Sequence, residues 1–177
     1  MVDGVGEAEG DARAHSRYTE SQETKIFDPT WPLAERPGFL IRRLHQIHVS
    51  LFSEECAVFG VTPLQYSLLS ELMSRIEADQ TTLANAVALD RTTTTGALRR
   101  LEARGLVSRS ISTSDRRAQR CRLTAEGIKI HNAMAGAARR AHEATVAVLS
   151  PAERQILTQL MKKVAIAHDQ RHEAAGL

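Results

Sequence analysis

The stretch from Asp90 to Thr124 holds the residues whose types and spacing could do chemistry. Four threonines, Thr92 to Thr95, follow an aspartate that suits a helix N-cap, because its carboxylate accepts from the free N–H groups of the first turn. Short side chains let a helix backbone sit deep in the DNA major groove, where threonine offers a hydroxyl and a methyl group. Threonine is a mediocre helix former, so solubility alone does not explain the run. We interpret this helix as a DNA-reading helix.

Arginine is concentrated in the same stretch. Residues 80–124 contain nine arginines, three acidic residues and no lysine, whereas the net charge of the whole chain is only +2. Arginine contacts guanine edges or phosphates with paired N–H donors. The predicted DNA contacts are hydroxyls and arginines of the helix, an arginine of the strand that follows, and a charged turn: Arg91, Thr92, Thr93, Thr94, Thr95, Arg99, Arg109, Asp115, Arg116 and Arg117.

The sequence around this helix predicts a winged helix-turn-helix. Gly105 suits the position after a helix end, and the apolar residues from there to Leu123 alternate as in two short strands joined by a polar turn at 112–115. Upstream, a capping box at 62–65 predicts a helix to about residue 76, then a polar break and a short helix over 81–88. This order of helices and strands is that of a winged helix.

Three longer helices are predicted outside the lobe at 61–123. They begin at Pro37, after Thr124 and after the capping signal Ser150-Pro151. The first carries the apolar stripe Leu40, Leu44, Ile47, Leu51 and Val58. We expect these helices, in the regions 37–60 and 124–177, to lack a core within one chain and to be covered by a second subunit. Residues 1–36 carry a net charge of −4 and are predicted to be largely disordered. The expected fold class is mainly α with a small β-hairpin wing and N- and C-terminal dimerisation helices.

A half-polar stripe, Ile41, His45, His48, Phe52 and Cys56, lies beside the apolar stripe of the first helix. Either the histidines fill a subunit seam, the favoured interpretation for each taken singly, or they form a pocket wall. An imidazole can donate to a carboxylate or phenolate, and aromatic rings can stack on a flat ligand. The predicted ligand residues are His45, His48, Phe52, Tyr66, Arg43 and Trp31. Two histidines are too few for zinc, so no metal is expected.

Other functional classes find little support in the sequence. It contains no glycine-rich phosphate loop, GxSxG or HExxH motif, so an enzyme is not expected. Cys56 and Cys121 make no disulfide framework, and Cys56 is interpreted as a buried, inert thiol. No membrane span or signal peptide is evident, so a cytoplasmic protein is expected. No cofactor is expected either.

Three runs of sequence together resemble the MarR (multiple antibiotic resistance regulator) family. They are residues 90–94 with 101–107, the turn Asp115-Arg116-Arg117, and the run LTAEG at 123–127. The resemblance spans about residues 38–168. It implies a homodimer, usually a repressor, that binds a pseudo-palindromic operator in double-stranded DNA and is released by a small, often aromatic anion. It also implies a wing arginine, here Arg116 or Arg117, in the minor groove.

The effector class rests on a second resemblance. The run GFLIRRLHQIH with an upstream tryptophan is similar to members that control aromatic-acid catabolism, including nicotinate-type pathways. An aromatic carboxylate or a phenolic compound is therefore the expected effector. A thiol- or metal-responsive regulator of the same fold remains the alternative.

Overall fold

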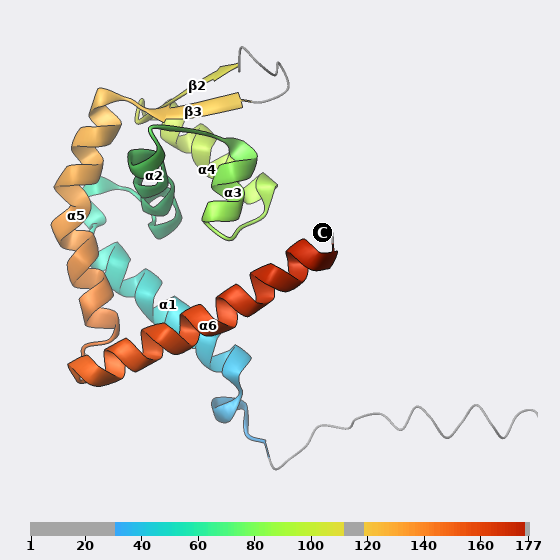
Figure 1. Cartoon of the computed structure of the whole chain (residues 1–177). Coiled ribbons are helices and arrows are strands. Elements are labelled where there is room, and N and C mark those ends of the chain that lie inside the picture. The colour runs from blue at the N-terminus through green and yellow to red at the C-terminus, as the bar shows by residue number, and fades with distance from the viewer. Residues whose placement is uncertain (1–30, 112–118, 176–177) are drawn as a thin grey trace, which may run out of the picture. The chain divides into compact units, whose positions relative to one another are not determined.

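The computed structural model describes residues 31–111 and 119–175. The chain divides into two compact units, Met1–Ile41 and Arg42–Leu177. The helices are α1 (Pro37–Glu55), α2 (Pro63–Arg75), α3 (Gln80–Ala86), α4 (Arg91–Ala103), α5 (Ala125–Thr145) and α6 (Pro151–Ala175) (Figure 1). The strands are β1 (Glu77–Asp79), β2 (Val107–Ile111) and β3 (Gln119–Leu123), and two short 3-10 turns are η1 (Leu33–Glu35) and η2 (Ala57–Phe59).

Side-chain caps set where the helices begin. Thr62 and Gln65 form the predicted capping box at α2, with hydrogen bonds in both directions. Thr124 accepts from the N–H of Gly127 at the start of α5. Ser150 and Glu153 pair in the same reciprocal way before α6. Each cap satisfies N–H groups that have no partner inside the helix, so these three predicted helix starts are confirmed.

The segment 77–80 was expected to be a polar break, and this expectation is wrong. Residues 77–79 form the strand β1, which pairs antiparallel with β3, so the sheet has three strands in the order β1-β3-β2. Ala78 lies opposite Cys121 on the buried side of the sheet. Glu77 faces outward and forms ion pairs with Arg120 and Arg122 of β3. The pairing is between segments distant in sequence, which a local pattern of three residues does not reveal.

One core joins helices α1 to α5 to the sheet. Its fully buried members are Phe52, Leu68, Leu69, Leu72, Leu83, Ala97, Leu98, Leu101, Cys121 and Met134, among others. Helix α5 packs against α2 and β3 and buries Met134, Ala137, Ala138 and Ala141. The expectation that α5 has no core within its own chain is therefore wrong. Its dense alanines let α5 approach α2 closely.

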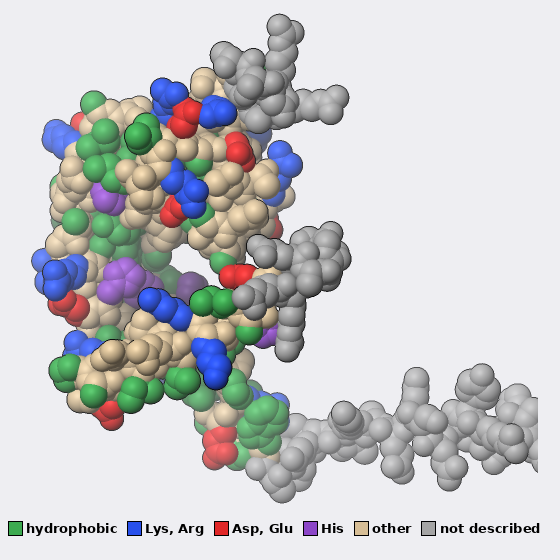
Figure 2. All heavy atoms as spheres, viewed as in Figure 1, with side chains coloured by type: hydrophobic (Ala, Val, Ile, Leu, Met, Phe, Trp, Pro, Cys, Tyr) green, Lys and Arg blue, Asp and Glu red, His purple; other side chains and the backbone are tan. Residues whose placement is uncertain are grey.

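Helix α6 differs from α5 because its apolar side is exposed. Ile156, Leu160, Met161, Val164 and Ile166 are each between 52% and 56% exposed. The space-filling view shows hydrophobic side chains at the surface along this helix (Figure 2). Leu44 and Ile47 of α1 are exposed as well. The described chain thus leaves two apolar helix faces in contact with water.

Gly127 marks a close approach between two segments of backbone. A Cβ atom at this position would lie 2.0 Å from the carbonyl oxygen of Leu106, which accepts from the N–H of Thr124. We expect Gly127→Ala to lower the free energy of unfolding by about 3 kcal/mol, at the upper end of overpacking effects, because neither backbone segment can give way. Chemical denaturation measures the loss.

Gly136 provides the matched control on the same helix. A Cβ atom there would meet nothing nearer than an arginine side-chain nitrogen at 3.7 Å. Gly136→Ala should raise stability by about 0.5–1 kcal/mol through helix propensity alone. Equal effects of the two substitutions would contradict the packing of α5 against residue 106.

Candidate functional site

Asp90 fixes the first turn of α4. One carboxylate oxygen accepts from the N–H of Thr93 at 2.8 Å and the other from the hydroxyl of Thr93 at 2.6 Å. These hydrogen bonds to the charged form hold the pKa of Asp90 below its ordinary value. The predicted N-cap is confirmed, and the Thr93 hydroxyl is committed to it.

The other three threonines have different surroundings. Thr92 is exposed. Thr95 donates its hydroxyl to the side-chain oxygen of Gln80 at 3.2 Å. Thr94 is fully buried, which does not fit its predicted contact with DNA. Thr94 precedes Ala97 by three residues and Leu98 by four, which places it on the buried side of the helix.

The predicted arginines also divide into two groups. Arg91 and Arg99 are exposed on α4. Arg109 instead forms an ion pair with Glu102 and donates a further hydrogen bond to Gln119 at 3.3 Å. Its side chain is only 15% exposed, so the structure directs it inward and gives it an internal role in place of the predicted DNA contact. The predicted contacts Asp115, Arg116 and Arg117 lie outside the described residues.

A cluster of imidazole and aromatic rings lies between α1 and α5. His48 bonds through Nδ1 to the hydroxyl of Thr145 at 2.9 Å and stacks on His142 at a centroid distance of 4.7 Å. Phe52 meets the His48 ring edge-on at 6.0 Å. Burial, followed by the neighbouring histidines His142 and His45, lowers the pKa of His48. A neutral imidazole is therefore favoured there, with one N–H donor and one acceptor.

The ring cluster continues into α2. Phe52 lies 5.8 Å from Tyr66, whose ring stacks on that of His131 at 5.2 Å and an angle of 10°. His131 also bonds to the hydroxyl of Ser70 at 3.1 Å. Burial raises the pKa of Tyr66. The name ring cluster is used below for His142, His48, Phe52, Tyr66 and His131. Histidine side chains gather at mid-height on the side where α5 runs (Figure 2).

Three of the six predicted ligand residues thus come together, and sequence reasoning missed His131 and His142. Both lie on the side of α5 whose spacing suits contact with α1 and α2, and that spacing could have indicated them. Arg43 and His45 are exposed on α1. Trp31 is 49% exposed in the first unit, where its carbonyl accepts from Arg36.

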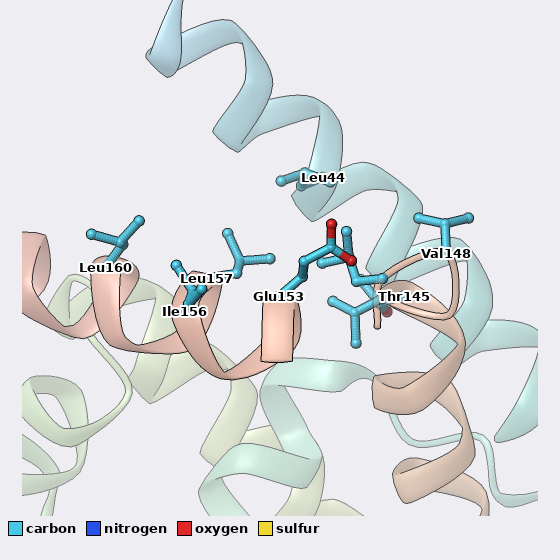
Figure 3. A pocket seen from close by; sticks show the side chains of 9 residues that line it. Leu44, Thr145, Val148, Glu153, Ile156, Leu157 and Leu160 are labelled. Carbon is cyan, nitrogen blue, oxygen red and sulfur yellow. The ribbon is translucent and has the colours of Figure 1, made fainter. Parts of the chain in front are cut away.

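A groove of about 420 Å³ runs along the apolar face of α6. It is lined by Leu44 of α1, the end of α5 with the turn after it, and Glu153, Ile156, Leu157 and Leu160 of α6 (Figure 3). Side chains from three elements face it, and nearly all are apolar. Such a lining suits an apolar helix face better than an anion.

The remaining candidate chemistry is limited. Cys56 and Cys121 are buried and unpaired with each other, and burial raises the pKa of both, that of Cys121 to about 11. A thiolate is the reactive form, so neither environment favours a redox sensor. In the described ranges, no three His, Cys, Asp or Glu side chains group as a metal site. In those ranges, too, no helix combines the length and apolar character needed to cross a membrane.

Comparisons with known proteins agree with this geometry. A sequence profile of the MarR family matches residues 61–118. The solved structure of BpsR from Bordetella bronchiseptica, whose DNA binding is regulated by 6-hydroxynicotinic acid, is 30% identical. It superposes with a TM-score of 0.72 over 76% of this chain and 96% of that one. The chain belongs to the MarR family. It is a transcription regulator with a DNA-binding winged helix.

Two further MarR-type proteins extend the comparison. The transcriptional repressor NicR of Pseudomonas putida is 29% identical over 149 residues, which are 84% of this chain and 94% of that protein. The repressor CouR, solved on a 23-mer DNA duplex, is 28% identical with a TM-score of 0.69, covering 75% of this chain and 94% of that one. The mainly helical fold with a winged helix-turn-helix, expected from the sequence, is confirmed.

Because Thr94 is buried, we predict that its hydroxyl lowers the stability of the fold and takes no part in DNA binding. Within the part of the chain that the structure describes, this hydroxyl has no hydrogen-bond partner. Thr94→Val keeps the shape and should raise the free energy of unfolding by about 1 kcal/mol without changing DNA affinity. Thr92→Val, at an exposed position two residues earlier, should instead weaken DNA binding and leave the free energy of unfolding nearly unchanged. Weaker DNA binding by Thr94→Val, at unchanged stability, would contradict the assignment.

Proposed function

We propose that the chain is a homodimeric repressor that binds a pseudo-palindromic operator and is released from it by a small aromatic anion. The observation that carries the DNA-binding part is the position of α4. Its inner side is buried by Ala97, Leu98 and Leu101, while Arg91 and Thr92 stand exposed at its capped N-terminus. Residues 61–123 form the proposed DNA-binding lobe. Base contacts come from Arg91, Thr92 and Arg99, and wing contacts from Arg116 or Arg117.

The proposed dimerisation region comprises residues 37–60 and 124–177. Its support is the apolar side of α6 and the apolar groove beside it, which a single chain leaves open. A second copy of the chain offers the same apolar faces, and a two-fold interface would bury both at once. Two-fold symmetry also matches the symmetry of a pseudo-palindromic operator, whose half-sites lie about 10 bp apart.

The proposed effector site is the ring cluster, centred on His48, Phe52 and Tyr66. Imidazole and phenol groups provide hydrogen bonds for a carboxylate or phenolate, and the rings provide flat faces for an aromatic ligand. The ligand of BpsR, 6-hydroxynicotinic acid, has this chemistry. Arg43, exposed on α1, is proposed to contribute a positive charge, and His45 of the same helix a hydrogen bond.

Arg104 supplies a physical route from the effector site to DNA. It lies at the C-terminal end of α4 and donates to the carbonyl of Phe59 at 2.8 Å and to that of Gly60. The segment it holds follows directly on α1, which carries Phe52. A ligand that shifts the end of α1 therefore acts on α4. Release requires that the ligand bind the displaced arrangement more tightly than the DNA-bound one.

The dimer proposal predicts that a charge in the groove separates the subunits. Leu160→Glu places a carboxylate on the apolar side of α6, and its burial in an interface would leave the charge unpaired. Light scattering should show twice the chain mass of 19.5 kDa for the wild type and the single mass for the variant. Gln155→Glu, on the opposite side of the same helix, is the control. A wild-type monomer at micromolar concentration would refute the dimer.

The DNA proposal predicts that an arginine of the helix and an arginine of the wing each contribute to operator binding. Arg91→Ala and Arg116→Ala should each weaken operator binding by about 1–3 kcal/mol if the side chain contacts bases, or lower the salt slope by about one if it contacts phosphate. Arg139→Ala removes an exposed arginine of α5 that pairs with Glu143, and should leave binding unchanged. Binding isotherms at several salt concentrations distinguish these outcomes. Wild-type affinity and salt slope in both variants would count against the proposed contacts.

The effector proposal predicts that His48→Phe uncouples release from binding. The substitution keeps a ring but removes the N–H donor and the acceptor, so DNA affinity without ligand should remain near wild type while release by 6-hydroxynicotinic or 4-hydroxybenzoic acid is lost. Gln46→Phe, at an exposed position on the other side of α1, is the control. If His48 serves only for packing at a helix or subunit interface, the variant should instead have a lower melting temperature and weaker dimerisation. Its response to the ligand should then remain.

A further inference from the structure

A closed chain of side-chain hydrogen bonds begins and ends on α4. Glu102, near the end of this helix, accepts from Nε of Arg109 at 2.7 Å and forms an ion pair with the same guanidinium. Arg109 stands on β2 and donates from Nη1 to Oε1 of Gln119 on β3. The first half of the chain thus joins the helix to both strands of the wing.

The second half returns from the wing to the helix. Oε1 of Gln119 also accepts from Nε2 of Gln80 at 3.0 Å. Oε1 of Gln80, the first residue of α3, accepts from the hydroxyl of Thr95 at 3.2 Å. We call this set, Glu102, Arg109, Gln119, Gln80 and Thr95, the polar ring.

The polar ring is placed to control both the position and the direction of the wing. Its two residues on α4, Thr95 and Glu102, are seven apart, about two turns or 10.5 Å along the helix axis. Gln119 pairs with Ile111, the last pair of the β2–β3 ladder before residues 112–118 that connect the two strands. Two separated anchors on α4 therefore hold the turn end of the hairpin, where Ile111 is exposed and adds little apolar packing.

We propose that the polar ring positions the wing against the recognition helix, so that Gln80, Gln119 and Arg109 determine sequence discrimination without touching DNA themselves. This inference rests on the proposed DNA contacts of α4 and the wing. Base contacts demand placement within about 0.5 Å, whereas phosphate contacts tolerate more movement. Loosening the ring should therefore reduce binding to the correct sequence more than binding to any other sequence.

Gln119 gives the sharpest test because both bonds to it use its carbonyl oxygen. Gln119→Leu removes this acceptor and breaks the ring, whereas Gln119→Glu keeps an acceptor for Arg109 and Gln80. The probes are a duplex selected by the wild type from a random-sequence pool and a scrambled duplex of the same composition. Fluorescence anisotropy at one fixed ionic strength gives the ratio of the two affinities.

Gln119→Leu should lower the affinity ratio about tenfold, mostly through the selected duplex, with the salt slope unchanged. Gln119→Glu should keep the wild-type ratio, because its added negative charge weakens both duplexes alike. Gln80→Leu removes the hydrogen bonds of Gln80 to Gln119 and Thr95 and should lower the affinity ratio by a similar factor. It provides the test if Gln119→Leu does not fold. Gln155→Leu on α6 is the neutral control.

Two results would overturn the inference. An unchanged ratio in Gln119→Leu and Gln80→Leu would show that the ring does not position the wing. A loss in Gln119→Glu as large as in Gln119→Leu would show that the amide contacts DNA directly. A wild type that selects no sequence from the pool would instead refute the proposed function, so the two failures are distinguishable.

Discussion

The orientation of α4 is the constraint on which the rest of the structure depends. Ala97, Leu98 and Leu101 are fully buried along one side of this helix, and with Thr94 they fix its rotation about its own axis. A rotation by one residue would turn the side chains through about 100° and bury an arginine in place of a leucine. Because the inner side cannot change, the outer side presents the same few residues to DNA.

The polar interactions around α4 add direction to this apolar anchor. Asp90 fixes where the helix begins, and Arg104 ties its end to the carbonyl groups that follow α1. Individually such exposed bonds add little to stability. Their consequence is geometric, since one end of the helix is linked to the ring cluster by a short segment of chain. This arrangement gives the proposed effector site and the proposed DNA contacts a common element.

The sequence predicted most of the fold because its signals are local. Helix caps, apolar spacing and the alternation of the hairpin are each set by neighbouring residues, so α2, α4 and the wing strands were predicted well. The strand β1 was missed because its stability comes from pairing with β3, which is distant in sequence. Among the site residues, Thr94 could have been assigned to the buried side by its spacing from Leu98. The ion pair of Arg109 with Glu102 could not have been predicted, because it depends on where Glu102 lies in space.

The central claim, that a two-fold dimer places two copies of α4 in successive major grooves, is tested most directly by hydroxyl-radical footprinting. The substrate is a duplex selected by the wild-type protein from a random-sequence pool. The account predicts protected stretches on each strand that are related by a dyad and centred about 10 bp apart. Addition of 6-hydroxynicotinic acid or a related aromatic acid should remove both stretches together. A single protected stretch without a dyad partner would contradict the account.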